Sequence, residues 1–289
     1  MVSAFFPEQF AALRALHCGG ERAFVESLGC SESWAPSGGK SGASFARTSD
    51  GRFVLKALSA RELQGALSLL PAYFEHMARV HFEALPSRLD GGGGGGVAPA
   101  SRASSFGLLV MENVFAGHRV RRTFDLKGAQ RAAAASEAEG EEDATEASRT
   151  FHDEELLRFT HQLPLFLEDG AKRLLAQCVW NDTLFLAKNN VMDYSLLLGL
   201  ADRETADDIP DGGGCVLVVG VIDYVRQYTV DKLAETVVKT LYDPSHQPTV
   251  IEPALYKARF REAMDRYFMA VPSEYEHAPW AAVRRLASP

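Results

Sequence analysis

Three polar, low-complexity segments divide the chain, and they constrain its fold more than any other feature of the sequence. They are the glycine-rich segment 86–105 and the two acidic segments 132–150 and 201–214. None has the apolar periodicity of a helix or a strand, so each is predicted to be a surface loop or a disordered insert. The folded core must therefore be assembled from the residues between them.

The inserts also account for the net charge. The 289-residue chain has a net charge of −8, of which segment 132–150 contributes −5 and segment 201–214 contributes −4, so the remainder is near +1. This acidity belongs to predicted loops and does not indicate a class of partner. With 46% hydrophobic and 24% charged residues, the composition is typical of one large globular domain or two closely joined lobes.

Several classes of protein are disfavoured. No segment approaches the roughly 18 apolar residues of a membrane span, and Pro7 and Glu8 interrupt what would be the apolar core of a signal peptide. The four cysteines show no CxxC spacing and the eight histidines no HExxH pair. We therefore expect an intracellular chain with neither a disulfide framework nor a protein-built zinc site.

Between the inserts the chain predicts an α+β fold. Residues 43–58 predict two strands joined at a turn, Ser49-Asp50-Gly51. Residues 107–115 and 215–225 also predict strands, the first of them buried. A hairpin-rich first third and a helix-rich remainder indicate two unequal lobes.

Helical spacing predicts four helices. They cover residues 62–82, interrupted by Pro71, residues 153–162 capped by Asp153, residues 169–186 capped by Asp169, and residues 252–268 with Pro253 in the first turn. In helix 169–186, one face carries Leu174, Leu175, Cys178, Val179 and Leu186. In helix 252–268, the predicted buried stripe is Tyr256, Phe260, Ala263, Met264 and Tyr267.

A glycine-rich turn and a lysine could bind phosphate groups. The turn contains Gly39 to Gly42, but Trp34 stands where a Walker A loop needs its first glycine, so a P-loop is excluded. Bare backbone amides could still lie against phosphates, although a simple hairpin turn remains an alternative. Lys56 ends the apolar strand that follows, as the nucleotide lysine of kinases does. The other interpretation is a strand-edge lysine that reaches water; Glu62 is a candidate ion-pair partner.

Two aspartates in apolar runs are the strongest chemical feature. Asp193 lies in "VMDYSLL" and Asp223 in "VIDYV". A buried carboxylate is costly unless it is paired or bound to a cation, and phosphoryl transfer needs one carboxylate for the attacking hydroxyl and one for Mg²⁺. Either aspartate could instead be a cap or turn residue. Since neither HRD nor DFG occurs, an ordinary protein kinase is not expected.

A basic cluster precedes the second insert. Residues 117–131 contain five arginine and lysine side chains and a single acidic one, Asp125. The basic residues are Arg119, Arg121, Arg122, Lys127 and Arg131. Such a cluster suits phosphate groups or an anionic bilayer. A nucleic-acid site is disfavoured, because this segment has no cluster of aromatic side chains on which bases could stack and the chain as a whole is not basic. A solvent-exposed charged strand with no binding role remains an alternative.

Together these motifs resemble the phosphatidylinositol phosphate kinases. "MENVF", "DLKG", "NDTLFL", "MDYSLL" and "GVIDYVRQYT" occur in that family's order, and "GGKSGASF", "RFVLK", "LPAYFEHM", "QPTVIEP" and "YKARFREAMDRYFMAVP" resemble its type III branch, the phosphatidylinositol 3-phosphate 5-kinases. The resemblance covers residues 4 to 273 apart from the inserts. It implies a two-lobed kinase fold, with an antiparallel N-lobe over residues 1–115, a mixed α/β C-lobe over 116–272 and a tail over 273–289.

The resemblance also implies roles for individual residues. Asp193, Lys56 and Lys127 would be catalytic, with Asp193 acting on the inositol 5-hydroxyl, and Asp223 would bind Mg²⁺. The ATP site would comprise Gly39, Lys40, Ser41, Gly42, Lys56, Met111, Glu112 and Asn113, the last three as the hinge beside adenine. The lipid head group or membrane would be met by Arg119, Arg122, Arg131, Lys232 and Lys239, and the specificity loop would span 226–253.

Expected partners are therefore ATP, Mg²⁺ and a phosphoinositide on a membrane surface, with peripheral association to endosomal or vacuolar membranes and no nucleic acid. The sequence departs from the family at Ala129, where DLKGS has serine, and at Val230 and Leu233 in the specificity loop. The altered specificity loop leaves a 4-phosphate 5-kinase as an alternative. A non-catalytic phosphoinositide-binding scaffold is a further alternative, which the retention of Lys56, Asp193 and Asp223 disfavours. The type III branch typically has upstream FYVE and chaperonin-like domains, so a kinase-only form or a fragment is expected.

Overall fold

The computed structural model describes residues 4–34, 44–82, 107–129, 149–202, 215–225 and 251–271. The chain divides into two compact units. Unit 1 comprises Met1–Arg122, Thr145–Arg149 and Gly199–Gly220, and unit 2 comprises Thr123–Ala144, Thr150–Leu198 and Val221–Pro289. The units interleave in sequence, because their boundaries fall within three of the strands described below.

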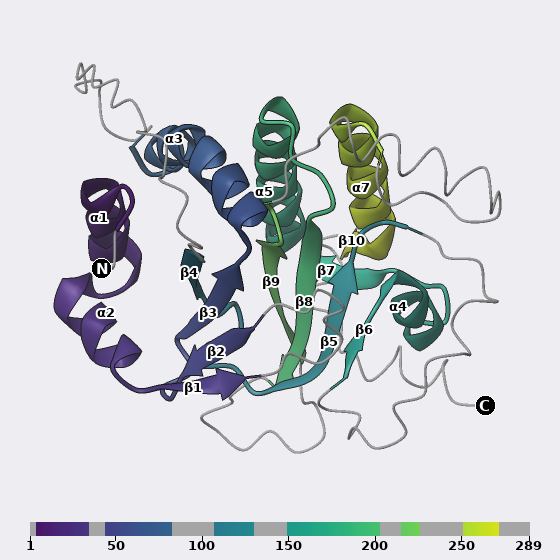
Figure 1. The fold of residues 1–289 in the computed structure, drawn as a ribbon. Coiled ribbons are helices and arrows are strands. Elements are labelled where there is room, and N and C mark those ends of the chain that lie inside the picture. Colours follow the sequence, from purple (N-terminus) through teal and green to yellow (C-terminus); the bar gives the residue numbers. More distant parts are fainter. Residues whose placement is uncertain are drawn as a thin grey trace. The chain divides into compact units, whose positions relative to one another are not determined.

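An antiparallel sheet forms the centre of unit 1 (Figure 1). Its order is β1-β2-β3-β4, with β1 over Ser31–Trp34, β2 over Phe45–Thr48, β3 over Phe53–Leu58 and β4 over Gly107–Glu112. The predicted turn at Ser49-Asp50-Gly51 is confirmed, since β2 and β3 pair antiparallel around it and Gly51 has φ 73°. Strand β4 also forms as predicted, but only Gly107 in it is buried, so the expectation of a buried strand there is wrong.

Three helices accompany this sheet: α1 (Pro7–His17), α2 (Gly20–Leu28) and α3 (Ala60–Phe82). Helix α3 packs on β3, and it continues through Pro71 where the sequence predicted an interruption. Buried side chains on both elements, including Phe53, Leu58 and Leu67, supply the apolar contacts. Continuous burial of one face stabilises a helix more than a single proline disfavours it.

The other described helices lie in unit 2, and the other described strands lie wholly or partly in it, since three of them cross the unit boundaries given above. The helices are α4 (Asp153–Phe159), α5 (Asp169–Lys188) and α7 (Pro253–Tyr267). The strands are β5 (Val120–Leu126), β6 (Thr150–Phe151), β7 (Leu165–Glu168), β8 (Ser195–Asp202), β9 (Cys215–Ile222) and β10 (Phe268–Val271). Strands β6-β5-β8-β9 form a four-stranded sheet, in which β5 and β6 are parallel, and β10 pairs with β7 in parallel. Helix α7 and strand β9 lie where the sequence predicted them.

Helix α7 has the buried stripe that its sequence predicted. Tyr256, Phe260, Ala263, Met264 and Tyr267 are all buried, and Pro253 occupies the first turn. Its aromatic rings pack on the segment before β8, with the ring centroids of Tyr194 and Tyr256 4.8 Å apart and those of Tyr194 and Phe260 5.1 Å apart. This aromatic cluster holds the start of β8 against α7.

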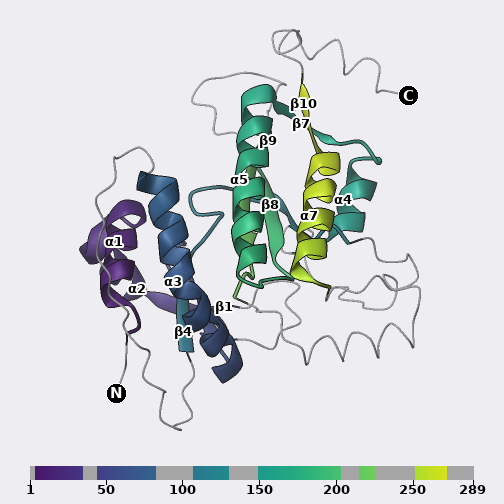
Figure 2. The same cartoon turned by 90° about the horizontal axis from the view of Figure 1, so that it is seen from above.

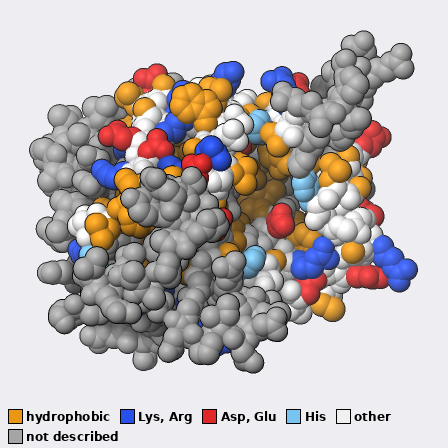
Figure 3. Space-filling view, turned by 180° about the vertical axis from the view of Figure 1, so that it is seen from behind, with side chains coloured by type: hydrophobic (Ala, Val, Ile, Leu, Met, Phe, Trp, Pro, Cys, Tyr) orange, Lys and Arg blue, Asp and Glu red, His pale blue; other side chains and the backbone are white. Residues whose placement is uncertain are grey.

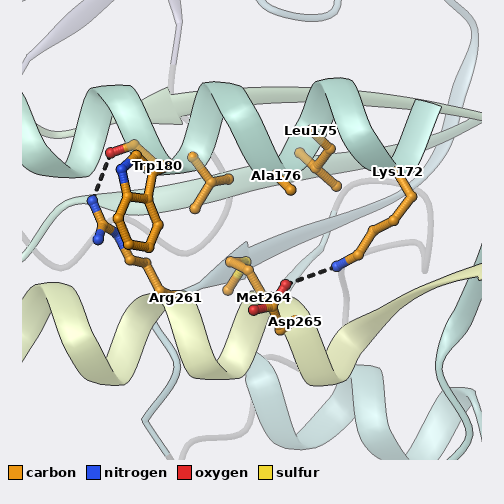
Figure 4. Close-up of a pocket in the computed structure, with 8 residues that line it drawn as sticks. Lys172, Leu175, Ala176, Trp180, Arg261, Met264 and Asp265 are labelled. Carbon is orange, nitrogen blue, oxygen red and sulfur yellow. Dashed lines mark hydrogen bonds and ion pairs between the residues drawn. The ribbon is translucent and has the colours of Figure 1, made fainter. Parts of the chain in front are cut away.

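Helix α5 lies beside α7, as Figures 1 and 2 both show. The face predicted for α5 is only partly buried: Val179 and Leu186 are buried, together with Thr183, whereas Leu174 is 62% exposed. Arg261 of α7 is 3.7 Å from the centroid of the Trp180 ring, and Lys172 pairs with Asp265 at 2.9 Å. These pairs flank a shallow pocket of ≈ 90 Å³ between the two helices (Figure 4).

Candidate active site

The Lys127 ammonium and Asp193 form the central pair of the candidate site. Lys127 follows β5, and its Nζ lies 2.9 Å from Asp193 Oδ1 and 3.1 Å from the backbone oxygen of Asp193. The Asp193 side chain is 12% exposed and that of Lys127 25%. A pair that is largely removed from water is screened little by salt, so the two groups hold each other more firmly than a surface pair does.

Asp193 lies in a bend directly before β8, held by buried neighbours. Its φ of 65° is left-handed, whereas Val191, Met192 and Tyr194 around it are completely buried. The Tyr256 hydroxyl donates to the backbone oxygen of Tyr194 at 2.5 Å. Burial, and then the charge of Asp193, raise the pKa of Tyr256 above its ordinary value, so this tyrosine remains a neutral donor.

Asp223 follows β9, the strand next to β8 in the sheet. Its backbone is also left-handed, with φ 60°, and its side chain is exposed. An exposed carboxylate is a hard oxygen ligand that suits Mg²⁺, which keeps several waters and takes one or two protein carboxylates. Among the residues that the structure describes, there is no group of three or more candidate metal ligands, and Mg²⁺ bound together with phosphates does not require one.

Lys56 lies in β3 of unit 1 and is 6% exposed. Its Nζ is 3.5 Å from Glu62 Oε1 at the start of α3, so the structure brings together the ion pair that the sequence suggested. Burial alone would raise the pKa of Glu62, but hydrogen bonds from Ser59 and the charge of Lys56 hold it below its ordinary value. Lys56 is therefore a buried cation with a fixed counter-ion.

The predicted hinge, Met111 to Asn113, forms the end of β4 and the residue after it. Met111 pairs with Val54 in the sheet. The Asn113 side chain donates to the backbone oxygen of Gly51 at 2.7 Å and accepts from the amide of Phe115 at 3.1 Å. This side chain ties β4 to the β2–β3 turn. The Asn113 backbone amide donates to the Arg52 backbone oxygen at 2.8 Å, and its backbone oxygen accepts from the amide of Ala116 at 2.9 Å. The hinge role stays a prediction.

The basic cluster is only partly described. Arg119 is exposed before β5, Arg121 forms an ion pair with Asp202 at 2.5 Å, and Arg122 is partly buried on β5. Basic and acidic side chains are interspersed on the face drawn in Figure 3. Arg131, Lys232 and Lys239 lie outside the described residues, as do Gly39, Lys40, Ser41 and Gly42.

Asp153 was predicted to cap α4, but the structure gives it a different position and different partners. The predicted cap of α4 is its first helical residue, and His152 is the N-cap; likewise Glu168, not Asp169, caps α5. The Asp153 carboxylate instead accepts hydrogen bonds from the backbone amides of Lys127 and Gly128 and from the Tyr267 hydroxyl. Nothing in the local pattern distinguished this role from that of a cap.

The fold and these motifs define an α+β, kinase-like protein, and comparison with known proteins gives its family. The family described as "Phosphatidylinositol-4-phosphate 5-Kinase" matches residues 30–212 and 204–267. The chain belongs to this family.

Its relatives include long proteins of fungi, plants and animals. The chain is 37% identical over 287 residues to a 1-phosphatidylinositol 3-phosphate 5-kinase of Saccharomyces cerevisiae, with 96% of this chain and 12% of that protein covered. It is 35% identical to a 1-phosphatidylinositol-3-phosphate 5-kinase of Arabidopsis thaliana, covering 95% of this chain and 15% of the relative. For the 1-phosphatidylinositol 3-phosphate 5-kinase of Homo sapiens the identity is 36%, with 88% and 12% covered. The chain thus spans less than a fifth of these relatives.

Among the described helices, none combines the length and the apolar character that a membrane crossing would need.

Proposed function

We propose that this chain is a lipid kinase domain that transfers the γ-phosphate of ATP to the inositol 5-hydroxyl of phosphatidylinositol 3-phosphate. The similarity that carries the proposal is the 37% identity, over 96% of the chain, to a protein named 1-phosphatidylinositol 3-phosphate 5-kinase. The Lys127–Asp193 pair supports it, because phosphoryl transfer depends on positioned charge more than on covalent chemistry. The reaction would occur with the domain bound peripherally at an endosomal or vacuolar membrane.

In the proposed reaction Asp193 accepts the proton of the 5-hydroxyl as the hydroxyl oxygen forms its bond to the γ-phosphorus. The bond between the γ-phosphorus and the bridging oxygen breaks, and ADP leaves. The Lys127 ammonium, 2.9 Å from Asp193 Oδ1, holds this carboxylate in place and adds positive charge beside the transferring group. Lys56 would bind the nucleotide phosphates, with Glu62 fixing its position.

Asp223 and Lys56 fit the nucleotide and metal that this reaction uses. Bound Mg²⁺ would neutralise the charge of the β- and γ-phosphates. Asp223 offers an exposed carboxylate for it, and the buried ion pair of Lys56 with Glu62 matches the lysine–glutamate pair of kinases. Met111 to Asn113 would form the hinge beside adenine.

Phosphatidylinositol 4-phosphate is the second candidate substrate, because the family that matches the chain is described as a 4-phosphate 5-kinase. The residues expected to choose the lipid lie in the segment 226–253, where Val230 and Leu233 depart from the family's pattern. The two substrates differ only in which inositol hydroxyl already carries phosphate. Basic side chains that contact this phosphate would therefore decide between them.

The test is product identification with vesicles that contain either 3-phosphate or 4-phosphate lipid, labelled ATP and Mg²⁺. We expect the bisphosphate formed from the 3-phosphate lipid, and a drop of at least about 10²-fold in kcat for Asp193→Asn, the loss of a positioned base. A strong preference for the 4-phosphate lipid would contradict the proposal that the 3-phosphate lipid is the substrate. Absence of turnover with both lipids, together with absence of thermal stabilisation by Mg·ATP, would indicate the non-catalytic scaffold.

A further inference from the structure

Asp153 lies at the centre of a buried hydrogen-bond network that faces away from its own helix. Its Oδ2 accepts the backbone amide of Lys127 at 2.9 Å, and its Oδ1 accepts the backbone amide of Gly128 at 2.7 Å. The Tyr267 hydroxyl donates to the same Oδ1 at 2.8 Å. Asp153 is 4% exposed and Tyr267 is 2% exposed. The carboxylate thus joins α4, the end of α7 and the turn after β5.

That turn also has little room to move. Gly128 has φ 69°, and a Cβ atom at this position would lie 2.8 Å from the Cβ of Ala263 and 3.2 Å from the backbone oxygen of Arg259. Helix α7 therefore lies directly behind Gly128, and the Asp153 carboxylate holds the two amides of the turn from another side. Two independent contacts define the backbone from which the Lys127 side chain extends.

The Lys127 side chain carries this constraint to Asp193. Its Nζ contacts both Oδ1 and the backbone oxygen of Asp193. We infer that Asp153 is a positioning residue: it fixes the Lys127–Gly128 turn so that the Lys127 ammonium stays against Asp193. The importance of this position for turnover rests on the proposed function, whereas the arrangement itself does not.

The chemistry of the network requires a carboxylate. Both oxygens of Asp153 act only as acceptors, and three donors face them. In Asp153→Asn one oxygen becomes an NH₂ group, which would point its hydrogens at a backbone amide or at the Tyr267 hydroxyl, so at least one buried donor loses its acceptor. The substitution keeps the volume of the side chain, so its effect reports on hydrogen bonding.

The direct test measures acylation of lysine amines by an amine-reactive ester, followed by mass spectrometry of individual residues. In Asp153→Asn we expect the labelling rate of Lys127 to rise about fivefold or more, since losing a charge-assisted hydrogen bond shifts a local equilibrium by at least this factor. Lys172 is the internal control: its Nζ lies 2.9 Å from Asp265 and its side chain is 18% exposed, much like Lys127, but it does not belong to this network. Its rate should not change.

Two further variants separate positioning from general loosening. Glu155→Gln disturbs the capping box of the same helix, where Glu155 Oε2 accepts the amide of His152 at 2.8 Å, and should leave Lys127 labelling unchanged. Tyr267→Phe removes one donor but keeps the ring, so it should raise Lys127 labelling less than Asp153→Asn does. If Asp153→Asn fails to fold, Tyr267→Phe still tests whether the network restrains Lys127. Equal rises at Lys127 and Lys172, or no rise in either network variant, would overturn the inference.

A double-mutant cycle tests the consequence for turnover. Asp153→Asn should lower kcat about tenfold or more, with the KM for ATP unchanged, in a chain that retains Lys127. In a Lys127→Ala background the same substitution should change kcat by less than about twofold, because residues that act through one another are not additive. An equal loss of kcat in both backgrounds would show that Asp153 does not act through Lys127. If the parent chain phosphorylates neither lipid, the proposed function fails, and the labelling result still decides the role of Asp153.

Discussion

Replacing Gly128 by alanine should destabilise unit 2 through two separable effects. With φ at 69°, any residue with a Cβ pays about 1–2 kcal/mol for the left-handed conformation. The added methyl would also lie 2.8 Å from the Cβ of Ala263, and forcing a methyl into a filled site typically costs about 1–3 kcal/mol. The expected loss in the free energy of unfolding is therefore about 2–5 kcal/mol.

A matched glycine separates the two effects. Gly117 has a similar φ of 75°, but no atom of the described residues lies within 4 Å of a Cβ added there. Gly117→Ala should therefore lose only the conformational part, about 1–2 kcal/mol. Because Gly117 lies in unit 1, this comparison gives the size of the conformational effect, and the contact itself needs a partner within unit 2.

Ala263→Gly provides that partner, because it removes the methyl that the new Cβ would meet. Alone it should cost about 2 kcal/mol, from the lower helix propensity of glycine and from the loss of a methyl that is buried at this position. Combined with Gly128→Ala it should restore about 1–3 kcal/mol, visible as a coupling energy in urea unfolding followed by far-UV circular dichroism. A coupling energy near zero would refute the close packing of the turn on α7, and with it one of the two constraints on Lys127.

Three other outcomes are expected. Arg261→Lys should lower the free energy of unfolding by about 1–3 kcal/mol in urea melts, because an ammonium cannot replace the guanidinium contacts to Thr183 Oγ1 at 2.7 Å and to the Trp180 backbone oxygen at 2.6 Å. The pKa of Glu62 is held below its ordinary 4.5, so its carboxylate stabilises the fold above that pH. Thermal melts should show the advantage of the parent chain over Glu62→Gln shrinking as the pH falls below that value; an advantage that grows there would contradict this sign. Lys56→Met should lower kcat/KM for ATP at least about 10²-fold in the lipid assay while leaving the fold intact by circular dichroism.

Local sequence patterns predicted those parts of the fold in which a single physical effect determines the local structure. The turn at Ser49-Asp50-Gly51 followed from glycine at a left-handed position, and the α7 stripe followed from helical spacing of large apolar residues. Helix α5 was harder, because Leu174 is apolar and yet 62% exposed. Apolar side chains are common on protein surfaces, so periodicity alone could not tell which face α7 covers.

The site was predictable as a set of residue types but not as a geometry. The family resemblance implied that Lys127 and Asp193 share a site, yet their 66-residue separation means that only the fold determines whether the two side chains meet. Asp153 shows the limit most clearly. An aspartate at a helix start is usually a cap, and its true partners, Lys127, Gly128 and Tyr267, lie 25 to 114 residues away.

The left-handed backbone at both aspartates explains why Asp193 interrupts an apolar run. A residue with a positive φ costs about 1–3 kcal/mol and persists only where its surroundings enforce it, and aspartate tolerates this conformation better than most residues. At Asp193 the enforcing groups are Val191, Met192 and Tyr194, all completely buried. The bend lets the backbone oxygen and the carboxylate of Asp193 reach the same Lys127 ammonium. Asp193→Asn keeps a residue that tolerates the bend, whereas Asp193→Ala adds conformational strain to the loss of the carboxylate. A larger loss of stability in the alanine variant than in the asparagine variant, at equal loss of activity, would separate the two roles of this residue.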